Sequence, residues 1–468
     1  MTARLQHGVH TAAAIAAGRW LLVLLIILVL WLPGAAHGAP APAGSPDAFL
    51  QEAGEPEFLP GWRLRMGVLA TDNITRSADP PGDEIIGVGE FGANWRYLGT
   101  RFAGGFDGTI AYRHYTQSSF DDEARANFLA AGNLFIIPDT FDWHITDRLA
   151  NAPVDPLATA SPTNIQLVNV LETGPRVTLR PGATNELTIA ASRAMVEAEE
   201  SPIDHMRDTG TASLFHDFSA NSSAGIVVNA YRVNFEPEAL APDFEQGDAQ
   251  LEYLSRTETR NLSIAGGASR VELADGFTRE TGTGWIRFGA RRTSDSYIYA
   301  AAERRAGDTA TAMLEDDLLL EEYGTATLIV TGDPFLSDSA VLRYTRGWRA
   351  HEWFVAGSAR ELDYFLSPLD QEQRGFQLGA QLMFSSRMQL DVTAASNDIE
   401  YLDFTRSDTI RRFSAEADYR IDRGWSLVTG LHYLDRESTD PTYSFDEVML
   451  TLFLSFSPRG RNPLESRR

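Results

Sequence analysis

Apolar and polar residues alternate in steps of two over stretches of about ten residues, most clearly in the last third of the chain. One face of such a stretch carries Phe376, Leu378, Ala380, Leu382 and Phe384, and Gln377, Gly379 and Gln381 alternate with them. The pattern resumes after a short turn and returns in residues 413–421 and 425–433. Because successive side chains of a strand point to opposite faces, it predicts β-strands with one apolar face. Tilted strands of this length cross a bilayer.

Charged residues occupy the polar face of these predicted strands. Glu416, Asp418 and Arg420 alternate there with alanine and tyrosine. An unpaired charge in the dry core of a soluble β-sandwich costs several kcal/mol. A water-filled lumen removes that cost, so the pattern favours an all-β fold, a transmembrane antiparallel up-and-down β-barrel.

The connections between predicted strands alternate between short and long, as periplasmic turns and extracellular loops do in outer-membrane barrels. The short ones include residues 98–100, 138–140, 181–183, 219–221, 293–295 and 422–424. The long, acidic ones include residues 72–84, 197–208, 236–248, 307–338, 361–373 and 435–446. The number of segments between these connections, with both termini in the periplasm, predicts about 18 to 20 strands, and the number must be even. Residues 120–162 are compatible with a hairpin over 127–148 or with a long folded loop.

The amino-terminal segment has the three parts of a secretory signal peptide. Arg4 and Arg19 precede an apolar run from Trp20 to Leu32, and Pro33 and small residues follow it. The run is shorter than the roughly 20 residues of a membrane-spanning helix. We therefore predict a cleaved signal peptide over 1–38, a short periplasmic segment over 39–60, the barrel over 61–457 and a polar tail over 458–468. The predicted location is integral to the outer membrane of a Gram-negative cell.

Aromatic residues lie near the ends of many predicted strands, as in the girdles of membrane barrels. The last strand places Leu452, Leu454 and Phe456 on its lipid face. An alternating final strand that closes on an aromatic residue resembles the signal read by the barrel-assembly machinery. Here a polar tail follows Phe456, so the aromatic residue is not terminal.

The formal net charge is -24, which argues against nucleic acid as a partner, since phosphates require a basic surface. The absence of cysteine excludes disulfide bonds, thiolate metal sites and a cysteine nucleophile. Lysine is also absent, so all 40 basic residues are arginine. Two explanations stay open: codon bias, and guanidinium groups in a lumen that bind carboxylates or phosphates bidentately.

Five arginines are predicted on or near the lumen face: Arg63, Arg65, Arg343, Arg374 and Arg420. They are candidates for a ladder that guides an anionic polymer through a barrel too wide for side chains to fill. The alternative is that they pair with Glu352, Glu416 and Asp418 on neighbouring strands and hold the wall together.

Four segments carry a resemblance to a known family: Gly67–Ile74, Asp83–Ile86, Gly99–Arg101 and the hairpins from Asp338 to Phe456. They resemble outer-membrane barrels of the PEP-CTERM/exosortase system, which are found beside exopolysaccharide genes in Gram-negative bacteria. The resemblance covers essentially the whole predicted mature chain. It implies a role in building, exporting or anchoring surface polysaccharide or the sorted proteins that accompany it. The family supplies no established catalytic or binding residue.

Few residues offer catalytic or metal chemistry. Asp204 and His205 are adjacent in a predicted extracellular loop near Asp208, and such a set at a barrel rim would suit activation of water. A divalent cation would suit the acidic run Glu315, Asp316, Asp317, Glu321 and Glu322. The alternative for both segments is an ordinary hydrated loop without a site. With no G-x-S-x-G, no H-E-x-x-H and no phosphate-binding loop, the sequence predicts no enzyme, no metal and no cofactor.

The sequence therefore predicts a non-enzymatic barrel linked to exopolysaccharide export or assembly, or to PEP-CTERM protein sorting. The main alternative is a general or anion-preferring diffusion porin, in which residues 307–338 would fold inward as a constriction loop. A hydrolase at the rim and a structural adhesin are further alternatives. The predicted partners are outer-membrane lipids and lipopolysaccharide, the assembly machinery, and exopolysaccharide or its export proteins.

Overall fold

The structure is a computed structural model that describes residues 61–79, 82–117, 120–155, 157–159, 161–236, 241–293, 295–308, 313 and 331–458. The predicted signal peptide, the segment over 39–60 and the tail beyond residue 458 lie outside the described residues. No helix in the described part of the chain is both long and apolar enough to span a bilayer.

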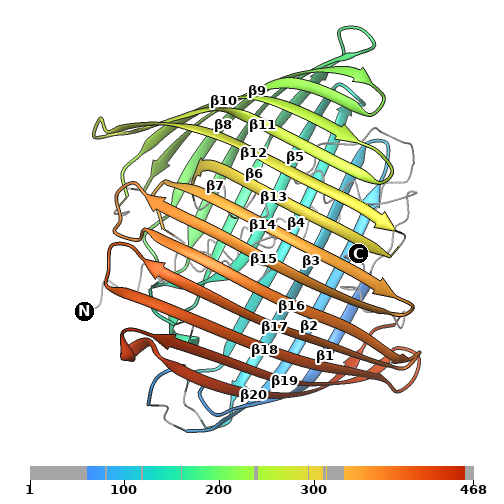
Figure 1. The fold of residues 1–468 in the computed structure, drawn as a ribbon, viewed down its shortest axis with the longest axis vertical. Coiled ribbons are helices and arrows are strands. Elements are labelled where there is room, and N and C mark those ends of the chain that lie inside the picture. Colours follow the sequence, from blue (N-terminus) through green and yellow to red (C-terminus); the bar gives the residue numbers. More distant parts are fainter. Residues whose placement is uncertain are drawn as a thin grey trace.

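Twenty antiparallel strands form one closed sheet across the described residues (Figure 1). They are β1 (Gly61–Thr71), β2 (Glu84–Leu98), β3 (Phe102–Tyr115), β4 (Glu123–Ile137), β5 (Phe141–Ala152), β6 (Gln166–Leu179), β7 (Asn185–Ala198), β8 (His205–Ser219), β9 (Ser222–Phe235), β10 (Phe244–Arg256), β11 (Arg260–Leu273), β12 (Thr278–Thr293), β13 (Ser296–Gly307), β14 (Phe335–Trp348), β15 (His351–Tyr364), β16 (Gln371–Ser385), β17 (Met388–Tyr401), β18 (Arg406–Arg420), β19 (Trp425–Ser438) and β20 (Phe445–Phe456), with short 3-10 helices η1 (Pro162–Asn164) and η2 (Pro441–Tyr443) between strands.

Each strand pairs with its neighbours in sequence, and the sheet closes where β1 pairs with β20. In Figure 1 the blue first strands and the red last strands meet at this seam. Leu64 lies opposite Phe456, whose ring centre is 5.5 Å from that of Trp62 and 4.7 Å from that of Trp425. The predicted up-and-down barrel is confirmed, with a strand number inside the predicted range.

Exposed apolar side chains surround the outside of the barrel. On β20, Leu450, Leu452 and Leu454 are 55, 48 and 43% exposed, while Thr451 and Ser455, which point to the other face, are buried. A protein surrounded by water rarely exposes so continuous an apolar surface, so this band faces lipid. The barrel is therefore an integral protein of the outer membrane, and the predicted lipid face of the last strand is confirmed. The reading of Leu452, Leu454 and Phe456 as an assembly signal stays a prediction.

The strands extend beyond the lipid band, because they run from 11 residues in β1 to 16 in β12. Several of the predicted long loops are consequently shorter than predicted, although the connection over 72–83 keeps nearly its predicted length. Glu361 and Glu372, both expected in one long loop, lie within β15 and β16, directly opposite each other. Of the two alternatives for residues 120–162, the hairpin over 127–148 is present, since β4 and β5 pair around residues 138–140.

Candidate functional site

On the lumen wall, arginines of one strand pair with carboxylates of other strands. On β1, Arg63 lies 2.6 Å from Glu90 of β2, and Arg65 lies 3.9 Å from Glu416 of β18. Both arginines alternate with exposed Leu64 and therefore point inward. These contacts support the interpretation that arginines hold the wall together, and Glu416 is one of the predicted partners.

Arg343 also points into the lumen, on β14. Its Nε atom donates to the Thr345 hydroxyl at 3.1 Å, and its guanidinium lies 4.3 Å from the centre of the Phe354 ring. Arg420 ends β18 at the side of the short turns, where its Nη1 atom is 3.5 Å from the Ser386 carbonyl oxygen. Whether these arginines guide a polymer stays a prediction.

The expected lumen position of Arg374 is wrong. Its side chain is 74% exposed and pairs with Glu372 at 2.9 Å on the outer face of β16. The reason is the period of two, because Arg374 has the same parity as the lipid-facing Phe376 and Leu378. The lumen face of this strand carries Gln371 and the residues that alternate with it.

A further lumen group joins β12 and β13. Glu303 lies 2.7 Å from Arg287 on β12 and 3.7 Å from Arg305, two residues along its own strand. Sequence reasoning missed this group, although the signal was present. Arg287 alternates with Ile286 and Phe288, which are exposed to lipid.

The connection between β13 and β14 reaches the far wall at Met313. Asp308, which follows β13, lies 3.2 Å from Arg207 on β8. Met313 is 1% exposed and packs against an apolar lumen cluster of β5–β7 that includes Val168 and Val196. Six strands, β7 to β12, separate β13 from β6 on that side of the sheet. Inward folding of the predicted constriction loop is thus supported at this residue, whereas the acidic run over 315–322 lies outside the described residues.

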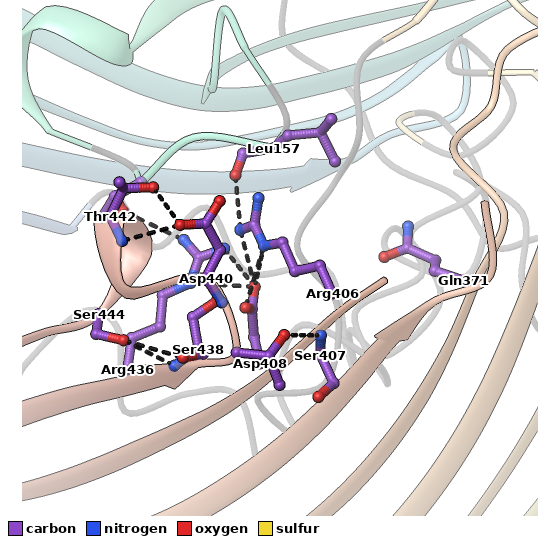
Figure 2. Close-up of polar contacts among 12 residues, drawn as sticks. Leu157, Gln371, Arg406, Ser407, Asp408, Arg436, Ser438, Asp440, Thr442 and Ser444 are labelled. Atoms are coloured by element: carbon purple, nitrogen blue, oxygen red, sulfur yellow. Dashed lines mark hydrogen bonds and ion pairs between the residues drawn. The ribbon is translucent and has the colours of Figure 1, made fainter. Parts of the chain in front are cut away.

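A second connection, between β5 and β6, reaches β18 and β19 (Figure 2). Arg406 Nη2 donates to the Leu157 carbonyl oxygen at 2.9 Å, and Arg436 Nη1 donates to the Thr159 hydroxyl at 3.2 Å. Six strands, β19, β20 and β1 to β4, lie between β18 and β5. Both arginines point inward and are more than nine-tenths buried, so the loop tip lies inside the mouth.

Asp408 holds the two arginines together. Its Oδ2 atom is 2.9 Å from Arg406 Nη2 and 2.5 Å from Arg436 Nη2, and its side chain is fully buried. The ring of Tyr443, in η2, lies 3.6 Å from the Arg406 guanidinium. A cation over an aromatic face is stabilised by the quadrupole of the ring, so Tyr443 and Asp408 together fix the orientation of Arg406. We call Arg406, Asp408, Arg436 and Tyr443 the mouth cluster.

The loop tip is a self-contained unit. Asn164 Nδ2 donates to the carbonyl oxygens of Asp155 and Thr159 at 3.0 and 3.1 Å, and its Oδ1 accepts from the Asp155 amide at 2.8 Å. Asp155 in turn accepts from the Leu157 amide at 2.9 Å. Side-chain bonds of this kind replace a missing strand ladder and give a loop a defined shape.

The proposed pairing of Asp204 with His205 does not form. Asp204 accepts the amide of Ala198 at 2.8 Å, whereas the buried imidazole of His205 contacts the Ile203 carbonyl oxygen through Nδ1 at 2.7 Å. Asp208 lies on the outer face of β8, where it pairs with Arg193 at 2.6 Å. Among the described residues, no group of three His, Asp or Glu side chains is placed to hold a metal ion.

Comparison with known proteins gives a likeness of architecture only. No protein-family model and no curated protein matches the chain. Among solved structures, it is similar to the copper transporter OprC, at 12% identity over 86% of this chain and 81% of that one, with a TM-score of 0.42. OccAB1 of Acinetobacter baumannii matches at 12% identity over 85% and 95%, with a TM-score of 0.36. The FrpB iron transporter of Neisseria meningitidis matches at 9% identity over 91% and 86%, with a TM-score of 0.46.

Proposed function

We propose that this protein is a diffusion channel of the outer membrane for small hydrophilic solutes, narrowed by its own connections. The observation that carries the proposal is that Leu157 bonds to Arg406 on β18 and Met313 bonds to Arg148 on β5. At least six strands separate each of these strands from the strands that flank the connection concerned. Connections that enter a barrel reduce a lumen this wide to a passage that discriminates by size. No step of catalysis is part of this function.

The charge distribution favours weak ion selectivity. Arg63, Arg65 and Arg287 each lie beside a carboxylate of another strand, so neither sign of charge dominates these parts of the wall. A passage lined with rings of one charge would instead select strongly for the opposite ion. A general channel is therefore favoured over a strongly anion-preferring one.

The test is reconstitution of the purified full chain into planar bilayers and liposomes. We expect discrete conductance steps, a small reversal potential in a salt gradient, and swelling with neutral sugars whose rate falls with sugar size. The heat-denatured protein is the matched control. Bilayers that show no more conductance steps than this control would reject the channel.

The exopolysaccharide-linked role stays a prediction that rests on the resemblance to PEP-CTERM-associated barrels. A clean deletion strain, its parent and a complemented strain separate the two functions. Loss or periplasmic trapping of surface polysaccharide, with normal uptake of small solutes, would favour the polysaccharide role. Unchanged polysaccharide with reduced uptake would favour the channel.

A further inference from the structure

The mouth cluster holds more positive than negative charge. Its two guanidinium groups share the single carboxylate of Asp408, and Arg406 and Arg436 are only 8 and 7% exposed. The two arginines also donate to the loop, where their acceptors are the neutral oxygens of the Leu157 carbonyl and the Thr159 hydroxyl. A guanidinium group gives a carbonyl or hydroxyl oxygen one charge-assisted hydrogen bond, whereas a carboxylate or phosphate accepts two parallel bonds from it and also carries the opposite charge. The loop thus occupies donors that an oxyanion would bind more tightly.

The loop tip can leave without disturbing the cluster. The bonds of Asn164 and Asp155 that shape the tip are internal to the loop. Asp408 and Tyr443, which orient the guanidinium groups, belong to β18 and η2 and contact the arginines independently of the loop. The site would therefore stay organised after the tip moves away.

We propose that Arg406 and Arg436 form a binding site for a carboxylate or phosphate group of a solute, and that the tip over 157–159 occupies this site in the closed mouth. The solute oxyanion accepts from the guanidinium N–H groups that now donate to the Leu157 carbonyl and the Thr159 hydroxyl, and the tip is displaced. This inference rests on the proposed channel function, for which it names a favoured solute class and a route to opening.

Other charges near the site are consistent with this assignment. Asp440 is the further carboxylate beside the cluster, but it is exposed and bonded to Thr442, at 3.1 Å from the amide and 2.7 Å from the hydroxyl. Glu447 on β20 is bound to Arg76 at 2.8 Å. Arg412 lies on the same face of β18, four residues past Asp408. An anion that leaves the mouth cluster toward the middle of the barrel would pass this second guanidinium group.

The experiment uses the full chain with Ala158→Cys, which introduces the only thiol because the sequence has no cysteine. The substitution leaves the Leu157 carbonyl and the Thr159 hydroxyl in place. An environment-sensitive fluorophore on this thiol reports movement of the tip. Inorganic phosphate, acetate and chloride are titrated at constant ionic strength. We expect a saturable signal change with phosphate or acetate and none with chloride, and the stronger of the two oxyanions identifies the preferred group.

Arg436→Gln should weaken the oxyanion response at least about tenfold, since it removes a charge-assisted donor pair. Arg436→Lys keeps the charge but loses the planar fork, and its oxyanion affinity should lie between those of the parent and the glutamine variant. It still tests the site if the glutamine variant does not fold. Arg411→Gln is the matched control, because Arg411 lies on the outer face of the same strand and pairs with Asp435. It should respond like the parent.

Three results would overturn the proposal: no saturable change with either oxyanion, an equal change with chloride, or an unchanged affinity in both Arg436 variants. Conductance is recorded on the same preparation, which separates the two claims. Channels that open without any oxyanion response would leave the channel function intact and reject the binding site. An oxyanion response in a protein that forms no channels would reject the channel function and support the binding site.

Discussion

The Nη1 atom of Arg148 on β5 donates a hydrogen bond of 2.8 Å to the carbonyl oxygen of Met313, a residue of the connection between β13 and β14. This bond and the apolar contacts of the Met313 side chain fasten one connection to the far wall. The mouth cluster fastens the β5–β6 connection to a different wall. The passage through the barrel is thus determined by a few contacts that are distant in sequence, and each can be broken separately.

Met313→Asp should release residue 313 from the β5–β7 wall. The new carboxylate would lie in an apolar pocket with Val168 and Val196, at a cost of several kcal/mol, which exceeds the gain from one hydrogen bond. We expect higher single-channel conductance with an unchanged barrel melting temperature. Met313→Leu conserves volume and should conduct like the parent. Identical conductance in the aspartate variant would mean that Met313 does not narrow the passage.

Asp408→Asn should lower the free energy of unfolding by about 3 kcal/mol, because it leaves two buried guanidinium groups without a countercharge. Urea titration of the barrel in micelles measures the loss. Asp398→Asn is the control, since Asp398 is exposed on β17 and, among the described residues, its side chain accepts one hydrogen bond, from the Thr409 hydroxyl. The control should change stability by less than about 0.5 kcal/mol. Equal effects of the two substitutions would contradict a structural role for the mouth cluster.

Leu342→Arg tests the assignment of the lipid face. Leu342 is 59% exposed in the middle of β14, and an arginine there would face hydrocarbon at a cost of about 2–4 kcal/mol. Ser339→Arg, on the lumen face of the same strand, should be tolerated. Heat-modifiable gel migration measures the folded fraction after insertion into liposomes. If the serine variant lost more folded protein than the leucine variant, the two faces would be assigned the wrong way round.

The sequence predicts the wall of the barrel well, because lipid on one side and water on the other impose an alternation that each strand shows by itself. Leu452 and Leu454 are assigned correctly from this local signal. The signal fades above the lipid band, where both faces are wet, and that is why Glu361 and Glu372 were predicted in a loop. Arg374 has the parity of Phe376 and so faces outward, at a level of the strand where an arginine on the outer face is solvated and pairs with Glu372.

The contacts inside the mouth have no comparable local signal. Arg406 and Leu157 are 249 residues apart, and their strands lie on different parts of the wall. A carbonyl oxygen is an acceptor in every residue, so no side-chain pattern marks Leu157 as a partner. Only the closure of the sheet and the length of the β5–β6 connection bring the two together. The length and acidity of residues 307–338 did indicate an inward loop, but not the residue at which it reaches the wall.

Asp333, in the connection that precedes β14, should give the barrel a pH-dependent stability. Its Oδ2 atom accepts the amides of Leu366 and Ser367 at 3.0 and 2.6 Å, while Oδ1 is buried with no partner among the described residues. Burial raises the pKa of this carboxyl above its usual value, although the amide bonds act in the opposite direction.

The direction in which the stability changes with pH follows from how many protons each state binds. Between the unfolded pKa of about 3.9 and the higher folded pKa, the folded barrel keeps a proton that the unfolded chain releases. The contribution of Asp333 to stability is therefore full below about pH 3.9, falls as the pH rises through this window, and is constant above the folded pKa. Asp333→Asn keeps an acceptor for the amides but cannot titrate. Subtracting its unfolding free energies from those of the parent, from about pH 3 to 6, should reveal this fall, and parallel curves would show that Asp333 titrates alike in both states.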